Sequence, residues 1–176
     1  MDFLIQGIGL VGALFAFIAF QSKKHFGIMV MKICSSLCFV LQFTLMKAYT
    51  GIAMNAFGIV VFIIDAILVA KNKKTLPFVI ISTIICVVLG IVSWIGCVSL
   101  FAIIGESIVT VSCGIKNSKY LRYVYFFGSV CWLIFDIVCF TLGGIITEVF
   151  SILSIIIATI RVLKKDTAKA NRNNEQ

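Results

Sequence analysis

The chain has 176 residues, of which 61% are hydrophobic and 12% are charged. A water-soluble domain carries about 25% charged residues, so this composition excludes an ordinary soluble protein. The formal net charge is +8, but the basic residues lie in short segments between apolar runs, which excludes the basic face of a nucleic-acid-binding domain. An excess of Lys and Arg in such loops is expected of a membrane protein. We therefore expect the lipid bilayer, and no nucleic acid, as a partner.

Seven apolar runs of about 20 residues follow one another along the chain, a length that crosses a bilayer as a helix. They cover residues 3–20, 27–46, 50–70, 77–93, 97–115, 122–141 and 144–163. The sequence therefore predicts an all-α transmembrane fold, a seven-helix bundle that occupies residues 1–163 as one domain. The polar residues 164–176 are predicted to form a disordered cytoplasmic tail.

Charge predicts how this bundle is oriented. With seven spans, one side of the membrane receives only Lys47, and the other side receives thirteen basic residues. These thirteen are Lys23, Lys24, Lys71, Lys73, Lys74, Lys116, Lys119, Arg122, Arg161, Lys164, Lys165, Lys169 and Arg172. The breaks near residues 93–94 and 142–144 carry no charge, but omitting either would put basic loops on both faces. Because basic loops stay in the cytoplasm, we expect the N-terminus outside and the C-terminus inside.

An internal repeat divides the seven spans. Residues 8–72 align without gaps on residues 101–165, at an offset of 93, and 13 of the 65 pairs are identical. Two three-helix repeats can share one orientation only if an odd number of helices joins them. We therefore predict a 3+1+3 arrangement of parallel repeats, residues 3–70 and 97–163, with a linker helix at residues 77–93.

The third span contains the run GIAMNAFGIVV at residues 51–61. Together with the chain length and the seven spans, this run resembles the YgjV-like bacterial inner-membrane proteins. More distantly, the chain resembles the SWEET and PQ-loop (MtN3-like) superfamily of small-solute transporters. The resemblance implies a multi-pass protein of the bacterial inner membrane that carries a small molecule.

The same resemblance implies a substrate pocket. Sugar carriers of that superfamily have Asn in a pattern I-x-x-N-x-x-G on the third helix of each repeat, and Asn55 occupies this place here. In the second repeat Glu148 stands at the equivalent position. The carriers also have a Trp sixteen residues earlier, which corresponds to Trp132 and, in the first repeat, to Phe39. By resemblance, Phe39, Asn55, Trp132 and Glu148 line one central pocket.

Acidic residues inside the spans are further candidates, because an ionisable side chain near the bilayer centre costs about 2.5–3.5 kcal/mol to insert. Glu106 lies near the middle of the fifth span and Asp136 in the sixth. If they face one cavity with Glu148, these carboxyl groups can exchange protons or hold a cation, and we predict such coupling for Glu106 and Asp136. The alternative is that each acid is protonated, hydrogen-bonded to a neighbouring helix, and structural.

Lys32 and Asp65 each lie five residues from the same end of adjacent spans. Their equal depth predicts a structural ion pair. The alternative is that Lys32 extends along its helix to the membrane interface.

The sequence thus favours a small-solute transporter or permease of unknown substrate, with proton linkage left open. A non-transporting membrane scaffold or assembly protein is the alternative. We expect no enzyme activity, catalytic residue, cofactor or metal, because the single His25 lies in a loop and the seven cysteines form no CxxC pair. Association into a homo-oligomer is left open.

Overall fold

The computed structural model describes residues 3–21, 25–71, 73–113 and 118–174. This part of the chain forms seven helices and no strand. The helices are α1 (Phe3–Gln21), α2 (His25–Leu45), α3 (Tyr49–Ala70), α4 (Leu76–Val92), α5 (Ser99–Cys113), α6 (Ser118–Cys139) and α7 (Leu142–Asn174). The predicted all-α bundle is thereby confirmed.

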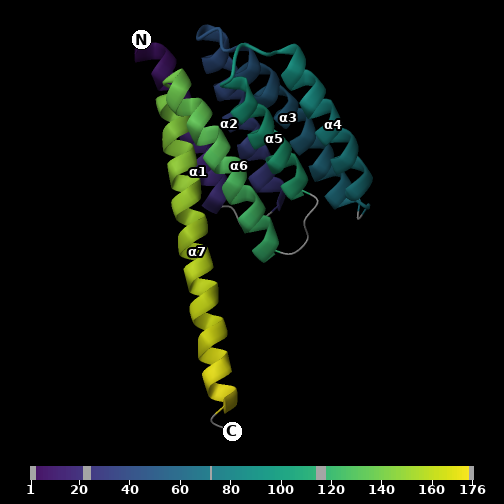
Figure 1. Cartoon of the computed structure of the whole chain (residues 1–176), viewed down its shortest axis with the longest axis vertical. Helices are drawn as coiled ribbons and strands as arrows, with labels where there is room; N and C mark the ends of the chain where they lie inside the picture. Colours follow the sequence, from purple (N-terminus) through teal and green to yellow (C-terminus); the bar gives the residue numbers. More distant parts are fainter. Residues whose placement is uncertain (1–2, 22–24, 72, 114–117, 175–176) are drawn as a thin grey trace.

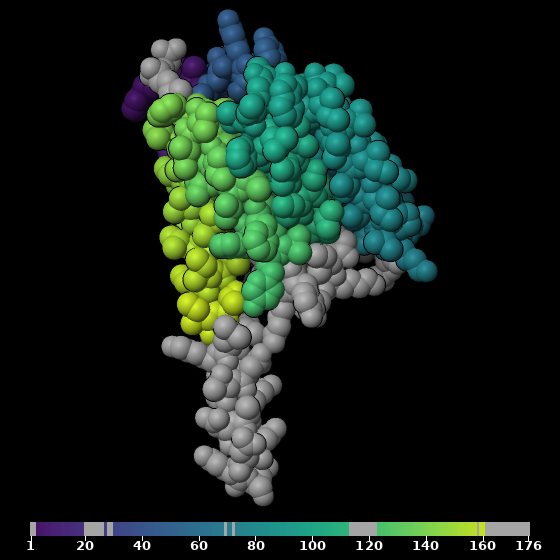
Figure 2. Space-filling view, viewed as in Figure 1, coloured from purple at the N-terminus to yellow at the C-terminus, as the bar shows by residue number. Residues whose placement is uncertain are grey.

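Six of the helices form a ring. Around it, α1 packs on α2, α2 on α3, α3 on α5, α5 on α6, α6 on α7, and α7 on α1. The remaining helix, α4, packs on α3 and α5 from outside the ring and forms one flank of the molecule, as Figure 1 shows. Figure 2 shows α7 on the opposite flank. The helices α1, α3, α5 and α7 begin at the end of the bundle drawn uppermost, which we call the upper end.

Many polar side chains are buried and many large apolar ones are exposed, unlike in a soluble domain. Large apolar side chains are exposed on every helix, and α4 exposes many of them, such as Ile84 at 61% and Val92 at 80%. In contrast, Gln42 and Thr110 are fully buried and Asp65 is 3% exposed. Such a surface is stable next to lipid tails, where buried polar groups must find partners inside the bundle.

One helix of the described residues is long and apolar enough, by length and composition, to cross a membrane, at Tyr49–Leu68 of α3. The other six helices contain apolar stretches of 10–17 residues. Four of these stretches fall within the other predicted spans, and the remaining two, Leu76–Val92 and Leu142–Ile157, begin one and two residues before the spans predicted there.

The helices α2 and α6 end in the same turn. Lys47 and Phe140 follow these helices with φ of 57° and 55°, the left-handed conformation that closes a Schellman turn. In both turns this residue donates its N–H to the carbonyl three residues earlier, and the next residue donates to the carbonyl five residues earlier. Both helices therefore reverse direction within two or three residues.

The break predicted near residues 142–144 is displaced, because the second of these turns lies at 140–141. The helix α7 already begins at Leu142, so Gly143 and Gly144 belong to its first turn. Because these two residues have no side chain, α7 can pack closely on its neighbours at this point. A Cβ at Gly143 would lie 2.2 Å from the backbone of Gly9 in α1.

Residues 164–174, for which the sequence predicts disorder, continue α7 as a helix that extends beyond the other helices (Figure 1). No Pro or Gly follows Gly144, and residues 164–174 contain three Lys and two Ala, which favour helix. Residues 175 and 176 lie outside the described part.

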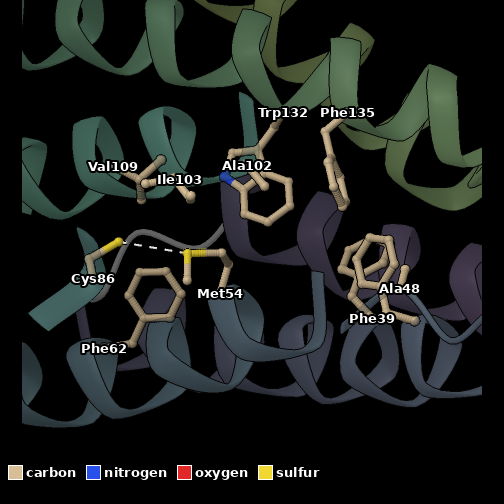
Figure 3. Close-up of a cluster of buried hydrophobic side chains, with 11 residues drawn as sticks. Phe39, Ala48, Met54, Phe62, Cys86, Ala102, Ile103, Val109, Trp132 and Phe135 are labelled. Carbon is tan, nitrogen blue, oxygen red and sulfur yellow. Dashed lines mark hydrogen bonds between the residues drawn. The ribbon is translucent and has the colours of Figure 1, made fainter. Parts of the chain in front are cut away.

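Aromatic and sulfur-containing side chains fill the centre of the bundle. Figure 3 shows Trp132 and Phe135 reaching from α6 toward Met54 and Phe39. The rings of Trp132 and Phe135 meet edge to face with centroids 5.6 Å apart. The Cys86 thiol of α4 donates to Met54 of α3 at 3.8 Å, which joins the outer helix to the ring.

The side chain of Gln6 joins α1 to the turn between α6 and α7. Its Nε2 donates to the carbonyl of Phe140 at 2.9 Å, and its Oε1 accepts from the backbone N–H of Leu142 at 3.0 Å. Gln42 of α2 donates to the same Oε1 at 3.3 Å. One buried amide thus holds α1, α2 and α7 together at the upper end.

Gln6→Leu is expected to destabilise the protein by about 1–3 kcal/mol, because it leaves buried donors and an acceptor without partners. Thermal unfolding of the detergent-solubilised chain measures the loss. Leu14→Ala, which truncates a side chain of the same helix that is 58% exposed, is the control and should change stability less. Equal effects of the two variants would show that these hydrogen bonds contribute no stability.

Candidate functional site

A cavity of about 100 Å³ lies inside the ring of helices. Its lining comes from α1, α2, α3, α5, α6 and α7, and among the described residues none comes from α4. A water molecule needs about 10–15 Å³ of such space, so the cavity accommodates several waters or a small solute.

Seven of the eight predicted site residues line this cavity. They are Lys32, Phe39, Asn55, Glu106, Trp132, Asp136 and Glu148. The eighth, Asp65, is buried at 3% exposure but lies outside the lining, and its pairing with Lys32 stays a prediction. The structure brings the four pocket residues and the three intramembrane acids to one place, while binding by them stays a prediction.

The ammonium group of Lys32 lies inside the ring rather than at its end. Its Nζ is 5.0 Å from the ring centroid of Phe62 on α3 and 5.1 Å from that of Tyr125 on α6. Both are cation–π contacts, which gain strength where water is excluded. The positive charge also acts on the carboxyl groups of Glu106 and Glu148.

Glu106 projects from α5 across the cavity to α3. The side chain is 5% exposed, and a Cβ at Gly58 would lie 2.9 Å from its Oε1. Gly58 therefore gives this carboxyl group the room it occupies, and Trp132 interacts with the same group. Among the described residues, Glu106 Oε1 has no hydrogen-bond partner.

Glu148 and Ser129 add two more oxygen atoms of this kind. Glu148 reaches the cavity from the first half of α7, and Ser129 from the middle of α6. Within the described part of the chain, no hydrogen bond of good geometry reaches Glu148 Oε2 or Ser129 Oγ, although these two side chains lie close enough to interact with each other. The cavity is therefore lined by three buried oxygens that can accept hydrogen bonds.

Asp136 and Asn55 are bound within their own segments. The hydroxyl of Thr141 donates to the Asp136 carboxylate, which packs against Gly144. The Asn55 amide donates to the carbonyl of Gly51 at 3.1 Å, one turn earlier in α3. These two residues shape the wall of the cavity, and their contacts hold them in place.

Gly58, the last residue of the I-x-x-N-x-x-G pattern, lines the cavity as well. Sequence reasoning did not select several other lining residues, among them Phe62, Tyr125 and Ser129. Two of them had a signal in the repeat, because Ser129 aligns with an identical Ser36 and Tyr125 with Lys32 at the offset of 93. Phe62 had none, since one more aromatic residue in an apolar span has no distinguishing pattern.

Exposed apolar side chains around buried polar groups and an acid-lined cavity are typical of a membrane protein. The chain belongs to the Imp-YgjV family, described as a bacterial inner membrane protein, whose model matches residues 3–166. This match confirms the predicted family and the location in the bacterial inner membrane. No curated protein and no solved structure shows significant similarity to the chain.

Proposed function

We propose that this protein is a small-solute transporter or permease whose substrate site is the central cavity. The observation that carries the proposal is the set of buried oxygens without partners on Glu106, Ser129 and Glu148. Such groups cost several kcal/mol away from water, so a bundle selected only for stability would pair or omit them. Polar groups around a cavity at mid-membrane depth are typical of a transport pathway.

The proposal includes seven membrane spans, with the N-terminus outside, and two parallel three-helix repeats joined by α4. Exposed apolar side chains on all seven helices support the spans. The first residues of corresponding helices support the repeats. The start of α2, His25, is 93 residues from the start of α6, Ser118. The start of α3, Tyr49, is likewise 93 residues from the start of α7, Leu142. The packing of α3 on α5 and of α7 on α1 supports a two-fold relation between the units.

The connections at the upper end also support the repeat. Lys47 and Phe140, which close the two Schellman turns, are 93 residues apart. So are Gln6 of α1 and Ser99 of α5, and each binds the first turn of the facing repeat's third helix. Gln6 accepts from the N–H of Leu142 at 3.0 Å, and the Ser99 hydroxyl lies 2.8 Å from that of Thr50.

The cavity lining repeats with the same offset. Seven pairs of lining residues are 93 positions apart: Ala16 and Val109, Lys32 and Tyr125, Ser36 and Ser129, Phe39 and Trp132, Phe43 and Asp136, Asn55 and Glu148, and Gly58 and Ser151. A site shared equally by two parallel repeats favours a carrier, because the units can rock against each other around it.

Transport is tested in proteoliposomes with panels of amines, sugars, vitamins and organic acids. We expect uptake or exchange of at least one panel, and at least a tenfold loss in Glu148→Gln and in Asn55→Ala with folding intact. Leu14→Ala, which truncates an exposed side chain outside the cavity, is the control and should retain transport. An imposed pH gradient tests proton linkage on the same vesicles.

No flux across all panels would overturn the transporter proposal. Wild-type flux in both Glu148→Gln and Asn55→Ala would instead place the substrate elsewhere in the molecule.

A further inference from the structure

We propose that the cavity binds a small organic cation with a primary ammonium group, and that the Lys32 ammonium competes with it for the same carboxyl groups. This inference rests on the proposed function, because it assigns a substrate class to the same site. It comes from the charges, the hydrogen-bonding groups and the aromatic rings that line the cavity.

The charges of the lining favour a cation. Three acids, Glu106, Asp136 and Glu148, face one basic residue, Lys32. Buried acids resist ionisation, and a positively charged guest stabilises their ionised form. An anion would disfavour that form, and a neutral solute would not stabilise it.

The hydrogen-bonding groups of the lining favour a donor. The three oxygens without partners, on Glu106, Ser129 and Glu148, come from α5, α6 and α7 and can all accept. A primary ammonium carries three N–H donors and no acceptor, so it matches three acceptors arranged around one space. A carboxylate has no donor, and a quaternary ammonium has charge without any N–H.

The aromatic rings show that an ammonium fits in this space. Lys32 Nζ already lies 5.0 Å from the Phe62 ring centroid and 5.1 Å from that of Tyr125. Rings at this distance attract a cation through their negative faces. Phe39 and Trp132 line the same cavity and provide an apolar wall for the carbon atoms of an amine. The volume of about 100 Å³ limits the guest to a small molecule.

Lys32 then acts as a tethered competitor. Its ammonium lines the same cavity as Glu106 and Glu148 and is close enough to both for their charges to interact. An arriving ammonium must share these carboxyl groups with it. Removing the Lys32 charge should therefore tighten binding of the amine, whereas removing a carboxylate should weaken it.

The test is ligand binding by the purified full-length chain in detergent, measured by thermal shift and by calorimetry. The probes are primary amines of two to six carbons, each compared with the alcohol and the carboxylic acid of equal length, and with tetramethylammonium. We expect binding of amines, at least tenfold weaker binding of tetramethylammonium, and none of the alcohols or acids. Lys32→Met should tighten amine binding about tenfold, and Glu106→Gln and Glu148→Gln should each weaken it at least tenfold.

The assignment would be overturned if no amine bound, or if alcohols or acids bound as tightly as amines. Unchanged amine affinity in both Glu→Gln variants, or weaker amine binding in Lys32→Met, would overturn it as well. Ser129→Ala, a smaller change, tests the site if either Glu variant fails to fold. Amine binding without flux in proteoliposomes would leave the ligand class standing and overturn transport. Flux of an acid or alcohol without amine binding would support transport and overturn the assignment of an ammonium ligand.

Discussion

Gly143→Val is expected to prevent the bundle from assembling, and Gly143→Ala to destabilise it by about 3 kcal/mol or more. A Cβ at this position would lie 2.2 Å from the carbonyl carbon and oxygen of Gly9, which is closer than a Cβ atom approaches any non-bonded atom in real structures. The obstacle is backbone rather than the end of a flexible side chain, so α1 and α7 would have to move apart. Overpacking of a tight contact costs about 1–3 kcal/mol when side chains can adjust, and here they cannot.

Thermal unfolding in detergent and the yield of monodisperse protein measure this effect. Gly7→Ala is the matched control, because Gly7 lies on the same helix as Gly9 and a Cβ there would meet nothing within 4 Å. In that open position alanine should be neutral or stabilise the helix by up to about 1 kcal/mol. If Gly143→Ala were as stable as Gly7→Ala, the close approach of α1 and α7 would be wrong.

Trp132→Ala is expected to destabilise the protein by about 3–5 kcal/mol, the usual cost of deleting a large aromatic side chain from a core. The indole is 8% exposed, stacks edge to face on Phe135 with centroids 5.6 Å apart, and fills the space over Gly105. Its removal would enlarge the central cavity and delete one of the two aromatic contacts of Phe135, which also contacts the Phe43 ring.

Trp132→Phe is the conservative variant for this position, since Phe39 occupies the corresponding place in the first half of the chain. We expect it to retain most of the stability, and unfolding midpoints of both variants against the wild type measure the difference. A small loss in Trp132→Ala would mean that the cavity wall rearranges and that Trp132 is not part of a fixed core.

Several features of the molecule follow from local sequence patterns. Runs of apolar residues predicted each helix, because backbone hydrogen bonds within a helix satisfy its own polar groups. All predicted ends but one agree with the helix ends to within about four residues. The exception is the end of α7, which runs past its predicted end because no Pro or Gly stops it. The family was also recognised from the sequence, and the family match confirms it.

The candidate site was predicted only in part. Phe39, Asn55, Trp132 and Glu148 were chosen by resemblance, and the structure brings them to one cavity. Lys32 was expected to pair with Asp65, and its position between two aromatic rings was not predicted. The sequence marks charged residues in apolar spans, but it does not indicate which of them face one another.

The sequence by itself therefore determined the number and order of the helices, their apolar exterior and the membership of a bacterial inner-membrane family. Only the tertiary structure decided that Gly9 and Gly143 bring α1 against α7, and that three oxygens of Glu106, Ser129 and Glu148 are left around one cavity. The physical reason is range. A helix depends on neighbours within about four residues, whereas these contacts join residues from distant parts of the chain whose distances depend on how whole helices pack.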